Sequence, residues 1–363
     1  MAKLDEARKK INQIDQQMAE LFIERMKASK EVALHKMEHA LPIYDALREQ
    51  EVINKNSELI ADITLREYYI NFLKDVMNIS KQYQYRIMSG LKVGYSGVEG
   101  AFAYIACKKM FPTANLIAYP DFDVAYHACE NGDCDVVVLP IENSYAGDVG
   151  SVMDLVFSGS LSINQMIELD VVHNLIAVEG ATLDTIKTVY SHPQALAQCS
   201  KYIKSHNFEE VEATNTAVAA KMVATANSNK IAAIASHETA SLYGLKVIET
   251  NINASRNNTT RFAAFSKAQN LPVSTNKMGE HFILVFTVKN EAGALAKTLN
   301  IIGSHGFNMR NLKSRPMKEL MWNYYFFVEL DGNINTPDGQ DMLRQLTTVC
   351  DRLKLVGTYQ SNK

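Results

Sequence analysis

The chain has 363 residues, of which 47% are hydrophobic and 21% charged, and its formal net charge is -3. This length predicts two or three domains rather than one core, and the composition excludes wholesale disorder. The small negative charge excludes a field that would attract nucleic acid or an anionic membrane, so any anionic ligand must be held by locally placed cations.

The first 88 residues are predicted to form an all-α domain. From Lys3 to about Lys36 there is no Gly or Pro, and apolar residues recur at three- and four-residue steps, which predicts an amphipathic helix about 50 Å long. Such a rod is longer than a compact monomeric domain of this size is wide, so we expect it to need a partner chain. Pro42 ends it, and further helices are expected over about 44–59 and 64–85.

The periodicity changes at Ser89-Gly90. Ala-rich helical stretches then separate short buried strands, predicted over residues 91–95, 135–140, 188–190 and 231–235. This alternation is typical of parallel α/β layers, and two such groups indicate two lobes with a cleft between them. A polar, turn-prone stretch from Gln269 to Asn276 is predicted to be a linker.

The remaining residues are predicted to form a ferredoxin-like α+β domain. Its elements follow the order strand, helix, strand, strand, helix, strand, which is the βαββαβ arrangement. They are expected over residues 281–288, 293–305, 309–317, 322–330, 338–353 and 355–359.

Cysteine usage and the N-terminus bear on compartment and cofactors. The five cysteines are odd in number and show no CxxC or Cys/His spacing, which predicts reduced thiols and no metal site. Met1 to Arg8 carry both charge signs without an apolar signal core, and no apolar run approaches membrane-spanning length. We therefore expect a cytoplasmic protein without a metal or other cofactor, and with no membrane or nucleic-acid partner.

The helical domain carries cations at spacings that suit a ligand site. Arg25 and Lys36 are eleven residues apart, which at 100° per residue places them within about 20° of one helix face. Arg8 lies about 100° away from Arg25 and roughly 25 Å along the axis, so one helix cannot present all three to a small molecule. A dimer with antiparallel long helices would bring Arg8 of one chain to the site of the other.

Three short motifs mark the middle segment. They are Pro140-Ile141-Glu142-Asn143-Ser144, Tyr190-Ser191-His192-Pro193-Gln194 and Thr260-Arg261-Phe262. Through them the segment resembles the prephenate dehydratase family, while the helical segment resembles an AroQ-type chorismate mutase and the C-terminal segment an ACT domain. The whole chain thus resembles the bifunctional chorismate mutase–prephenate dehydratases.

This resemblance implies domains over residues 1–88, 91–268 and 279–363. The expected activities are an isomerase step from chorismate to prephenate and a lyase step from prephenate to phenylpyruvate, with L-phenylalanine as the effector of a homodimer or higher homo-oligomer. The fold class is then multidomain: an all-α mutase domain, a two-lobed α/β dehydratase domain and a ferredoxin-like ACT domain.

For the mutase, the resemblance implies a pocket that fixes chorismate and stabilises charge on its ether oxygen. Lys36 and Gln84 would donate to that oxygen, Arg8 and Arg25 would bind carboxylates, and Glu49 would hold the ring hydroxyl. The matching positions are Arg8, Arg25, Lys36, Asp45, Arg48, Glu49, Ser80 and Gln84.

For the dehydratase, the departing ring hydroxyl needs a proton donor, and the carboxylates need cationic or amide contacts. The resemblance makes Thr260 the essential residue, as donor or as part of a relay, with Arg261 beside it for a carboxylate. It further nominates Glu142, Asn143, Ser191, Gln198 and Thr216. His192 is a weaker candidate for the acid, because Pro193 indicates a turn.

For the effector, the resemblance implies two segments of the ACT domain. These are Gly293-Ala294-Leu295-Ala296, at a helix N-terminus that offers free amides to a carboxylate, and Ser314-Arg315-Pro316. Two residues depart from the family pattern, since Lys313 replaces an acid and Ala296 replaces a valine.

Other hypotheses remain open from the sequence. One is a non-catalytic two-lobed binding protein with an amino-acid sensor, and another is a dehydratase with an inactive mutase domain. A dinucleotide-dependent dehydrogenase is disfavoured, because the glycines of Gly94-Tyr95-Ser96-Gly97-Val98-Glu99-Gly100 follow G-x-x-G-x-x-G rather than G-x-G-x-x-G.

Overall fold

The computed structural model describes residues 2–39, 41–254, 257–269, 280–317 and 323–360. The chain divides into two compact units, residues 1–92 and 93–363, which we describe separately. Most of the linker predicted over 269–276 lies outside the described residues. None of the described helices is long and apolar enough to cross a membrane.

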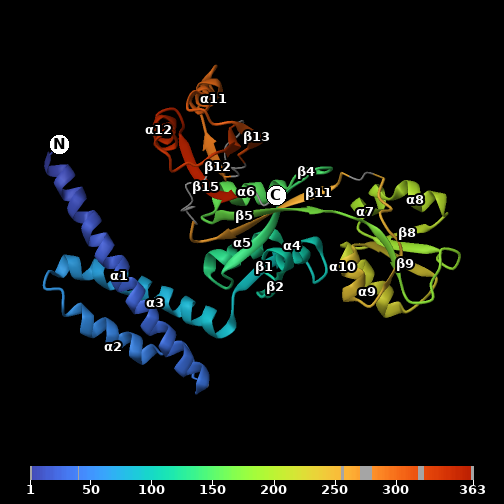
Figure 1. Cartoon of the computed structure of the whole chain (residues 1–363), viewed down its shortest axis with the longest axis horizontal. Coiled ribbons are helices and arrows are strands. Elements are labelled where there is room, and N and C mark those ends of the chain that lie inside the picture. The colour runs from blue at the N-terminus through green and yellow to red at the C-terminus, as the bar shows by residue number, and fades with distance from the viewer. Residues whose placement is uncertain (1, 40, 255–256, 270–279, 318–322, 361–363) are drawn as a thin grey trace. The chain divides into compact units, whose positions relative to one another are not determined.

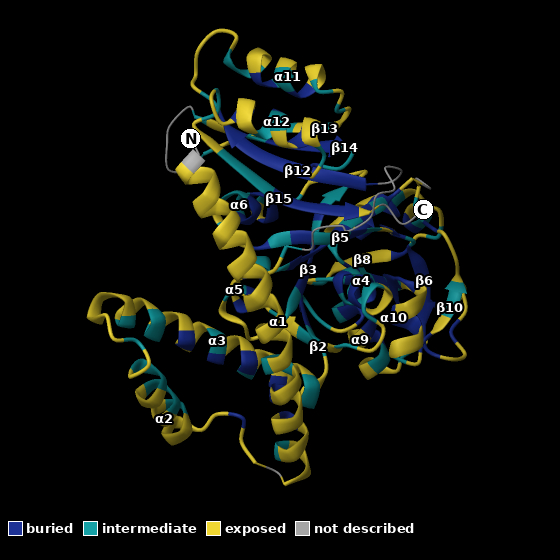
Figure 2. Ribbon diagram, turned by 60° about the vertical axis from the view of Figure 1, so that its left-hand side comes forward, coloured by how far each residue is buried: buried dark blue, intermediate teal, exposed yellow. Residues whose placement is uncertain are grey.

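The first unit consists of three helices, close to the predicted ones: α1 (Ala2–Glu38), α2 (Ala46–Ser57) and α3 (Ile63–Ser89). Asp45 and Asp62 cap the N-termini of α2 and α3 by accepting backbone N–H bonds. Figure 2 shows α1 exposed along most of its length. Its exposed side chains include large apolar ones: Leu4, Ile11, Ile14, Met18, Leu21 and Phe22.

The second unit begins with two lobes (Figure 1). The first lobe contains β1 (Lys92–Ser96), α4 (Phe102–Met110), β2 (Asn115–Tyr119), α5 (Phe122–Asn131), β3 (Val136–Asn143), β4 (Gly147–Asp148), α6 (Gly150–Ser158), β5 (Ser162–Asp170) and the returning β11 (Thr259–Ser266). The second contains β6 (Asn174–Ala177), β7 (Thr188–Ser191), α7 (Pro193–Gln198), α8 (Ser200–Ser205), β8 (Glu209–Glu212), α9 (Thr216–Ala226), β9 (Ile231–Ala235), α10 (His237–Leu242) and β10 (Lys246–Glu249).

The C-terminal domain has the predicted βαββαβ order. Its elements are β12 (Glu280–Thr287), α11 (Ala294–Ser304), β13 (Met309–Pro316), β14 (Tyr324–Asp331), α12 (Pro337–Leu346) and β15 (Arg352–Gln360). The last helix is shorter than predicted, because the hydroxyls of Thr347 and Thr348 donate to the carbonyls of Arg344 and Gln345 and close its final turn.

Both sheets of the second unit are mixed, whereas the sequence suggested parallel layers. The larger sheet has the order β13-β14-β12-β15-β5-β11-β3-β1-β2, with β4 paired to β3, and the smaller has the order β10-β6-β9-β7-β8. In the first lobe β11 runs antiparallel to both β3 and β5. The chain therefore returns from the second lobe through the middle of the first lobe's sheet.

The C-terminal sheet is covered on both faces. Phe282, Leu284 and Phe286 of β12 pack in a core with α11 and α12. Ile283 and Val285, which alternate with them, belong to the core of the first lobe. Every residue of β12 is accordingly buried, and the domain shares its core with the first lobe.

The two parts of the larger sheet meet at Gly357 of β15, which pairs with Ile163 of β5. A Cβ at Gly357 would overlap the carbonyl oxygen of Ile163. We therefore predict that Gly357→Ala destabilises the second unit by about 2 kcal/mol or more, because backbone cannot move aside as a flexible side chain can.

The control is Gly303→Ala in α11, where an added Cβ meets nothing within 4 Å and should stabilise by up to about 1 kcal/mol. Thermal unfolding of the whole chain measures both. Equal midpoints for the two variants would contradict the tight approach of β15 to β5.

Candidate active sites

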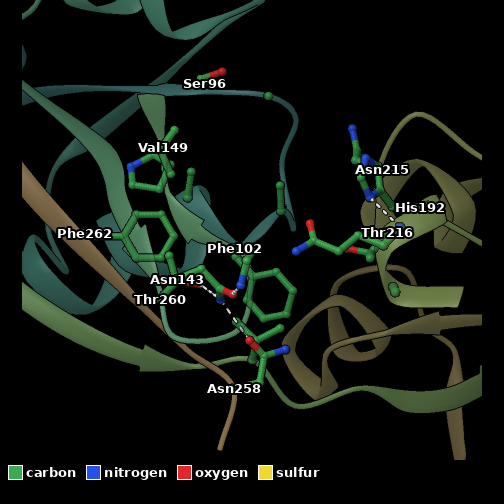
Figure 3. Close-up of a pocket in the computed structure, with 18 of the residues that line it drawn as sticks. Ser96, Phe102, Asn143, Val149, His192, Asn215, Thr216, Asn258, Thr260 and Phe262 are labelled. Carbon is green, nitrogen blue, oxygen red and sulfur yellow. Dashed lines mark hydrogen bonds between the residues drawn. The ribbon is translucent and has the colours of Figure 1, made fainter. Parts of the chain in front are cut away.

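A cavity of about 680 Å³ opens between the two lobes of the second unit. Four of the predicted dehydratase residues line it: Asn143, Gln198, Thr216 and Thr260. In Figure 3, Asn143, Thr260 and Phe262 lie on one side and His192, Asn215 and Thr216 on the other. The cavity is therefore built by both lobes, as the predicted cleft requires.

Asn143 holds Thr260 in a defined hydrogen-bonding state. The Oδ1 of Asn143 accepts from the backbone N–H groups of Tyr145 and Ala146 at 3.0 and 2.8 Å, so its amide nitrogen must be the group that faces Thr260. That nitrogen lies 2.9 Å from Thr260 Oγ1 and 2.8 Å from Asn258 Oδ1. Because Thr260 Oγ1 accepts from Asn143, its own proton is free to be donated into the cavity.

Strand alternation separates the remaining motif residues from the cavity. Asn143 pairs with Thr260 in the β3–β11 register, and Glu142 pairs with Arg261. Successive side chains of a strand point to opposite faces, so Glu142 and Arg261 lie behind the cavity. Neither is among the residues that line it.

Arg261 is bound to the C-terminal domain instead of a ligand. Its guanidinium makes two 2.8 Å hydrogen bonds to Glu329 of β14, and a third, at 3.4 Å, to Glu142. Burial alone would raise the pKa of Glu329, but the hydrogen bonds and charge of Arg261 outweigh it and lower that pKa. We expected Arg261 to contact a substrate carboxylate directly. Its guanidinium faces Glu329 instead of the cavity.

Ser191 also departs from the expected role. It is fully buried at the end of β7, and its hydroxyl donates to the carbonyl of Ile234 at 2.6 Å. This bond ties β7 to β9 within the second lobe. Ser191 does not line the cavity.

His173 is a cavity residue that the sequence reasoning missed. Gln198 Oε1 accepts from Asn258 Nδ2 at 3.0 Å and lies 2.8 Å from His173 Nε2, which assigns the imidazole proton to Nε2. Its Nδ1 is buried and has no partner among the described residues. Burial lowers the pKa of His173, opposed by the bond to Gln198, so the ring is neutral and Nδ1 is an acceptor. No sequence pattern around His173 signalled this role.

The cavity has polar side chains but no formal cation among its described lining residues. Among its described lining residues there is no Lys or Arg, and Asp148 is acidic. Asn215 caps α9 and Thr216 begins it, so a helix N-terminus with free amides borders the cavity. His192 caps α7, where its Nδ1 accepts from the backbone N–H of Gln194, which matches the expected turn role.

In the first unit, the structure brings some of the predicted mutase residues together. Arg25 donates to the Ser80 hydroxyl and, at 3.4 Å, to the carbonyl of Val76, and burial lowers the pKa of Arg25. Gln84 follows Ser80 by one turn of α3 and is buried, with no partner for its Oε1 among the described residues. Arg25, Ser80 and Gln84 thus form one polar strip along α1 and α3.

Other predicted mutase residues make contacts of their own. Lys36 donates to the carbonyl of Ile43 at 2.6 Å, and Asp45 serves as the cap of α2. Arg48 pairs with Glu51 in solvent, and Arg8 is exposed on α1.

The sequence reasoning missed Lys81 in this unit. Its Nζ lies 2.7 Å from Glu49 and over the ring of Tyr44. Among the described residues, one group of possible metal ligands has its ligand atoms close together. It consists of His35, Glu38 and His39, all of them exposed.

The two effector segments lie at the same end of the C-terminal sheet. Arg315 of β13 and Thr287 of β12 both pair with Tyr325, and Gly293 caps α11 shortly after β12 in a left-handed conformation. Arg315 is bonded to Asp154 of α6 at 3.1 Å. Its guanidinium is thus held by the catalytic lobe.

The folds and sites define a multidomain enzyme: a helical unit, a two-lobed catalytic domain and a regulatory α+β domain. Family models match in that order: chorismate mutase type II over residues 7–85, prephenate dehydratase over 93–270 and the ACT domain over 282–347. The chain belongs to the bifunctional chorismate mutase/prephenate dehydratase family. It is an enzyme of phenylalanine biosynthesis with both activities. The predicted bifunctional enzyme is therefore favoured over the non-catalytic binding protein.

Relatives cover nearly the whole chain. A bifunctional chorismate mutase/prephenate dehydratase of Buchnera aphidicola subsp. Schizaphis graminum is 30% identical over 98% of this chain and 95% of its own length. That of Aquifex aeolicus is 28% identical over 99% and 98%. The crystal structure of a prephenate dehydratase from Arthrobacter aurescens in complex with L-Phe is 26% identical, with a TM-score of 0.68 over 75% of this chain and 90% of that one.

Asn143→Asp tests the hydrogen-bonding state of Thr260. A carboxylate at 143 can only accept, so it would take the Thr260 proton that the amide leaves free. We expect kcat of the dehydratase to fall by about 10²-fold or more, the usual contribution of a proton donor. Chorismate consumption, assayed on the same sample, should not change. A kcat for prephenate within twofold of wild type would contradict the assignment.

Proposed function

We propose that prephenate is converted to phenylpyruvate in the cavity between the two lobes. The reaction breaks the bond from the ring to its carboxylate, releases CO2 and expels the ring hydroxyl, which leaves as water once it has taken a proton. Aromaticity supplies the driving force, so the enzyme must orient the substrate and supply that proton. The observation that carries this proposal is the hydrogen bond that Asn143 donates to Thr260 Oγ1, which leaves the proton of this buried hydroxyl available to a ligand in the cavity.

Thr260 is the proposed donor to the departing hydroxyl, directly or through a relay. A threonine hydroxyl is a weak acid, so Asn143 contributes by fixing its direction and not by ionising it. The cavity wall beside it is apolar, formed by Phe102 and Phe262. Fewer competing waters near the ring strengthen a hydrogen bond made there.

The carboxylates are proposed to be held by neutral donors on the second lobe. The free backbone amides at the N-terminus of α9, with Asn215 and Thr216, suit one carboxylate. Gln198 and Asn258 form a connected polar group beside it, together with His173, whose free Nδ1 is an acceptor and does not bind a carboxylate. We retain Glu142, Ser191 and Arg261 as supports of the strands behind the site rather than as groups that touch substrate.

In the first unit, we propose that chorismate binds along the strip formed by Arg25, Ser80 and Gln84. The buried Oε1 of Gln84, which has no partner among the described residues, supports a ligand there. Lys36 and Glu49 remain the proposed partners of the ether oxygen and the ring hydroxyl, with Arg48 and Asp45 at the rim. These roles require Lys36 to exchange its bond to Ile43, and Glu49 its bond to Lys81, for the ligand.

Assembly, compartment and domain bounds are further proposals. The exposed apolar side chains of α1 support an antiparallel helix pair in a homodimer, in which Arg8 completes the partner's mutase site. The five free cysteines support a reducing cytoplasm. We propose domains over residues 1–88, 91–268 and 279–363.

L-Phenylalanine is the proposed effector. The relative with bound L-Phe and the ACT domain support a site formed by Gly293–Ala296 and Ser314–Pro316. Because Arg315 is bonded to Asp154 of the catalytic lobe, an effector that drew Arg315 away would alter how the two domains meet. This gives the two arrangements that feedback inhibition requires.

Thr260→Ala tests the proposed function when chorismate loss and phenylpyruvate formation are followed separately. We expect the variant to consume chorismate at the wild-type rate and to accumulate prephenate, with dehydration reduced by about 10²-fold to 10⁴-fold.

The matched control is Thr259→Ala, the neighbouring threonine, whose hydroxyl is bonded to Asp170 and does not line the cavity. It should retain dehydratase turnover. Normal phenylpyruvate formation by Thr260→Ala would contradict the proposal that Thr260 and this cavity carry the dehydratase reaction. Loss of both activities would show that the two units are not independent.

A further inference from the structure

Lys313 of the ACT strand β13 reaches across to the back of the catalytic cavity. Its Nζ lies 2.9 Å from Glu142 and also contacts Asp148, and its side chain is only 13% exposed. Glu142 and Asp148 are paired across the β3–β4 hairpin. One lysine from the regulatory domain thus joins two carboxylates of a single catalytic hairpin.

The hairpin matters because it forms part of the cavity wall. Ala146, Gly147, Asp148 and Val149 all line the cavity, and Asn143, which holds Thr260, pairs with Gly147. Prephenate is a dianion, yet the described lining residues include no Lys or Arg. Two unneutralised carboxylates in this hairpin would repel the substrate.

Other cations are already committed. Arg261 is 3.4 Å from Glu142, but its two short bonds go to Glu329. Among the described ion pairs, Asp148 has no cationic partner except Lys313. Removing the charge of Lys313 therefore adds one net negative charge beside the cavity.

We propose that Lys313 is a positioning residue of the dehydratase: from the ACT domain, it offsets one of the two negative charges of the Glu142–Asp148 hairpin and so allows dianionic prephenate to bind. This inference rests on the cavity being the dehydratase site. The proposal also explains why position 313 carries a lysine where the resemblance expects an acid. An acidic side chain there would face the carboxylates of Glu142 and Asp148 and be repelled by them. It also provides a route by which movement of the regulatory domain changes substrate affinity.

A charge series at this position tests the proposal in the full-length protein. Lys313→Arg keeps the charge, Lys313→Met removes it and Lys313→Glu reverses it. One unit charge acting across about 10 Å at an effective dielectric near 20 changes binding on the order of tenfold. We expect KM for prephenate to stay near wild type for Arg, to rise about tenfold for Met and to rise further for Glu, with kcat within about twofold.

Three controls accompany the series. Lys289→Met removes an exposed lysine of the same domain and should leave KM unchanged. Chorismate consumption should be the same in every variant. Added salt should reduce the difference in KM between Lys313→Met and wild type only weakly, because the Lys313 side chain is largely buried and salt screens buried charges poorly.

An unchanged KM in both Lys313→Met and Lys313→Glu would overturn the proposal. A parallel fall in kcat and melting temperature would also overturn it, because it would show that Lys313 only holds the domains together. If the single variants are unstable, Lys313→Met combined with Asp148→Asn decides: recovery of KM supports the electrostatic role, and failure to recover rejects it. Thr260→Ala tests the cavity itself independently.

Discussion

The structure of the second unit depends on one ion pair, between Arg261 of the catalytic strand β11 and Glu329 of the ACT strand β14. Glu329 is completely buried and also bonds to the hydroxyl of Tyr359. A buried carboxylate without a partner is strongly destabilising, by about 3–5 kcal/mol. Arg310 of the same sheet lies 3.8 Å from Glu329, but the two 2.8 Å bonds to this carboxylate come from Arg261, so Arg261 is its main partner. The residue before Arg261 is Thr260, so the contact that docks the regulatory domain also fixes the strand that carries the proposed proton donor.

Alternation along β3 and β11 explains how one short motif serves two purposes. Asn143 and Thr260 face the cavity, while Glu142 and Arg261 face the ACT domain. The regulatory domain thus touches the catalytic pair from behind without entering the cavity. Lys313 and Arg315 extend the same contact to the β3–β4 hairpin and to α6. A rearrangement of this contact would shift the backbone of β11 and change the charge of the β3–β4 hairpin. Both border the proposed dehydratase cavity, so the effect would be direct.

Periodicity predicted most of the elements, because long amphipathic helices and continuous apolar strands leave clear patterns. The helices of the first unit and the βαββαβ order lie close to the expected positions. Periodicity could not predict which elements pack against one another. The apolar run of β12 predicts a strand, but not that its second face packs on another domain. Likewise, the motif identifies Glu142, Asn143, Thr260 and Arg261 together, and only the strand register divides them. His173 and Lys81 carry no local signal, since distant contacts give them their surroundings.

The most direct test of this account is to measure both activities and the unfolding midpoint of full-length Glu329→Gln. Loss of the charge weakens the bond to Arg261 without changing the shape of the side chain. The account predicts a lower midpoint for the second unit and dehydratase activity reduced by about tenfold or more, since breaking a buried pair costs several kcal/mol, while chorismate consumption is retained. A variant with wild-type stability and dehydratase activity would show that the regulatory domain does not hold the catalytic strand in place.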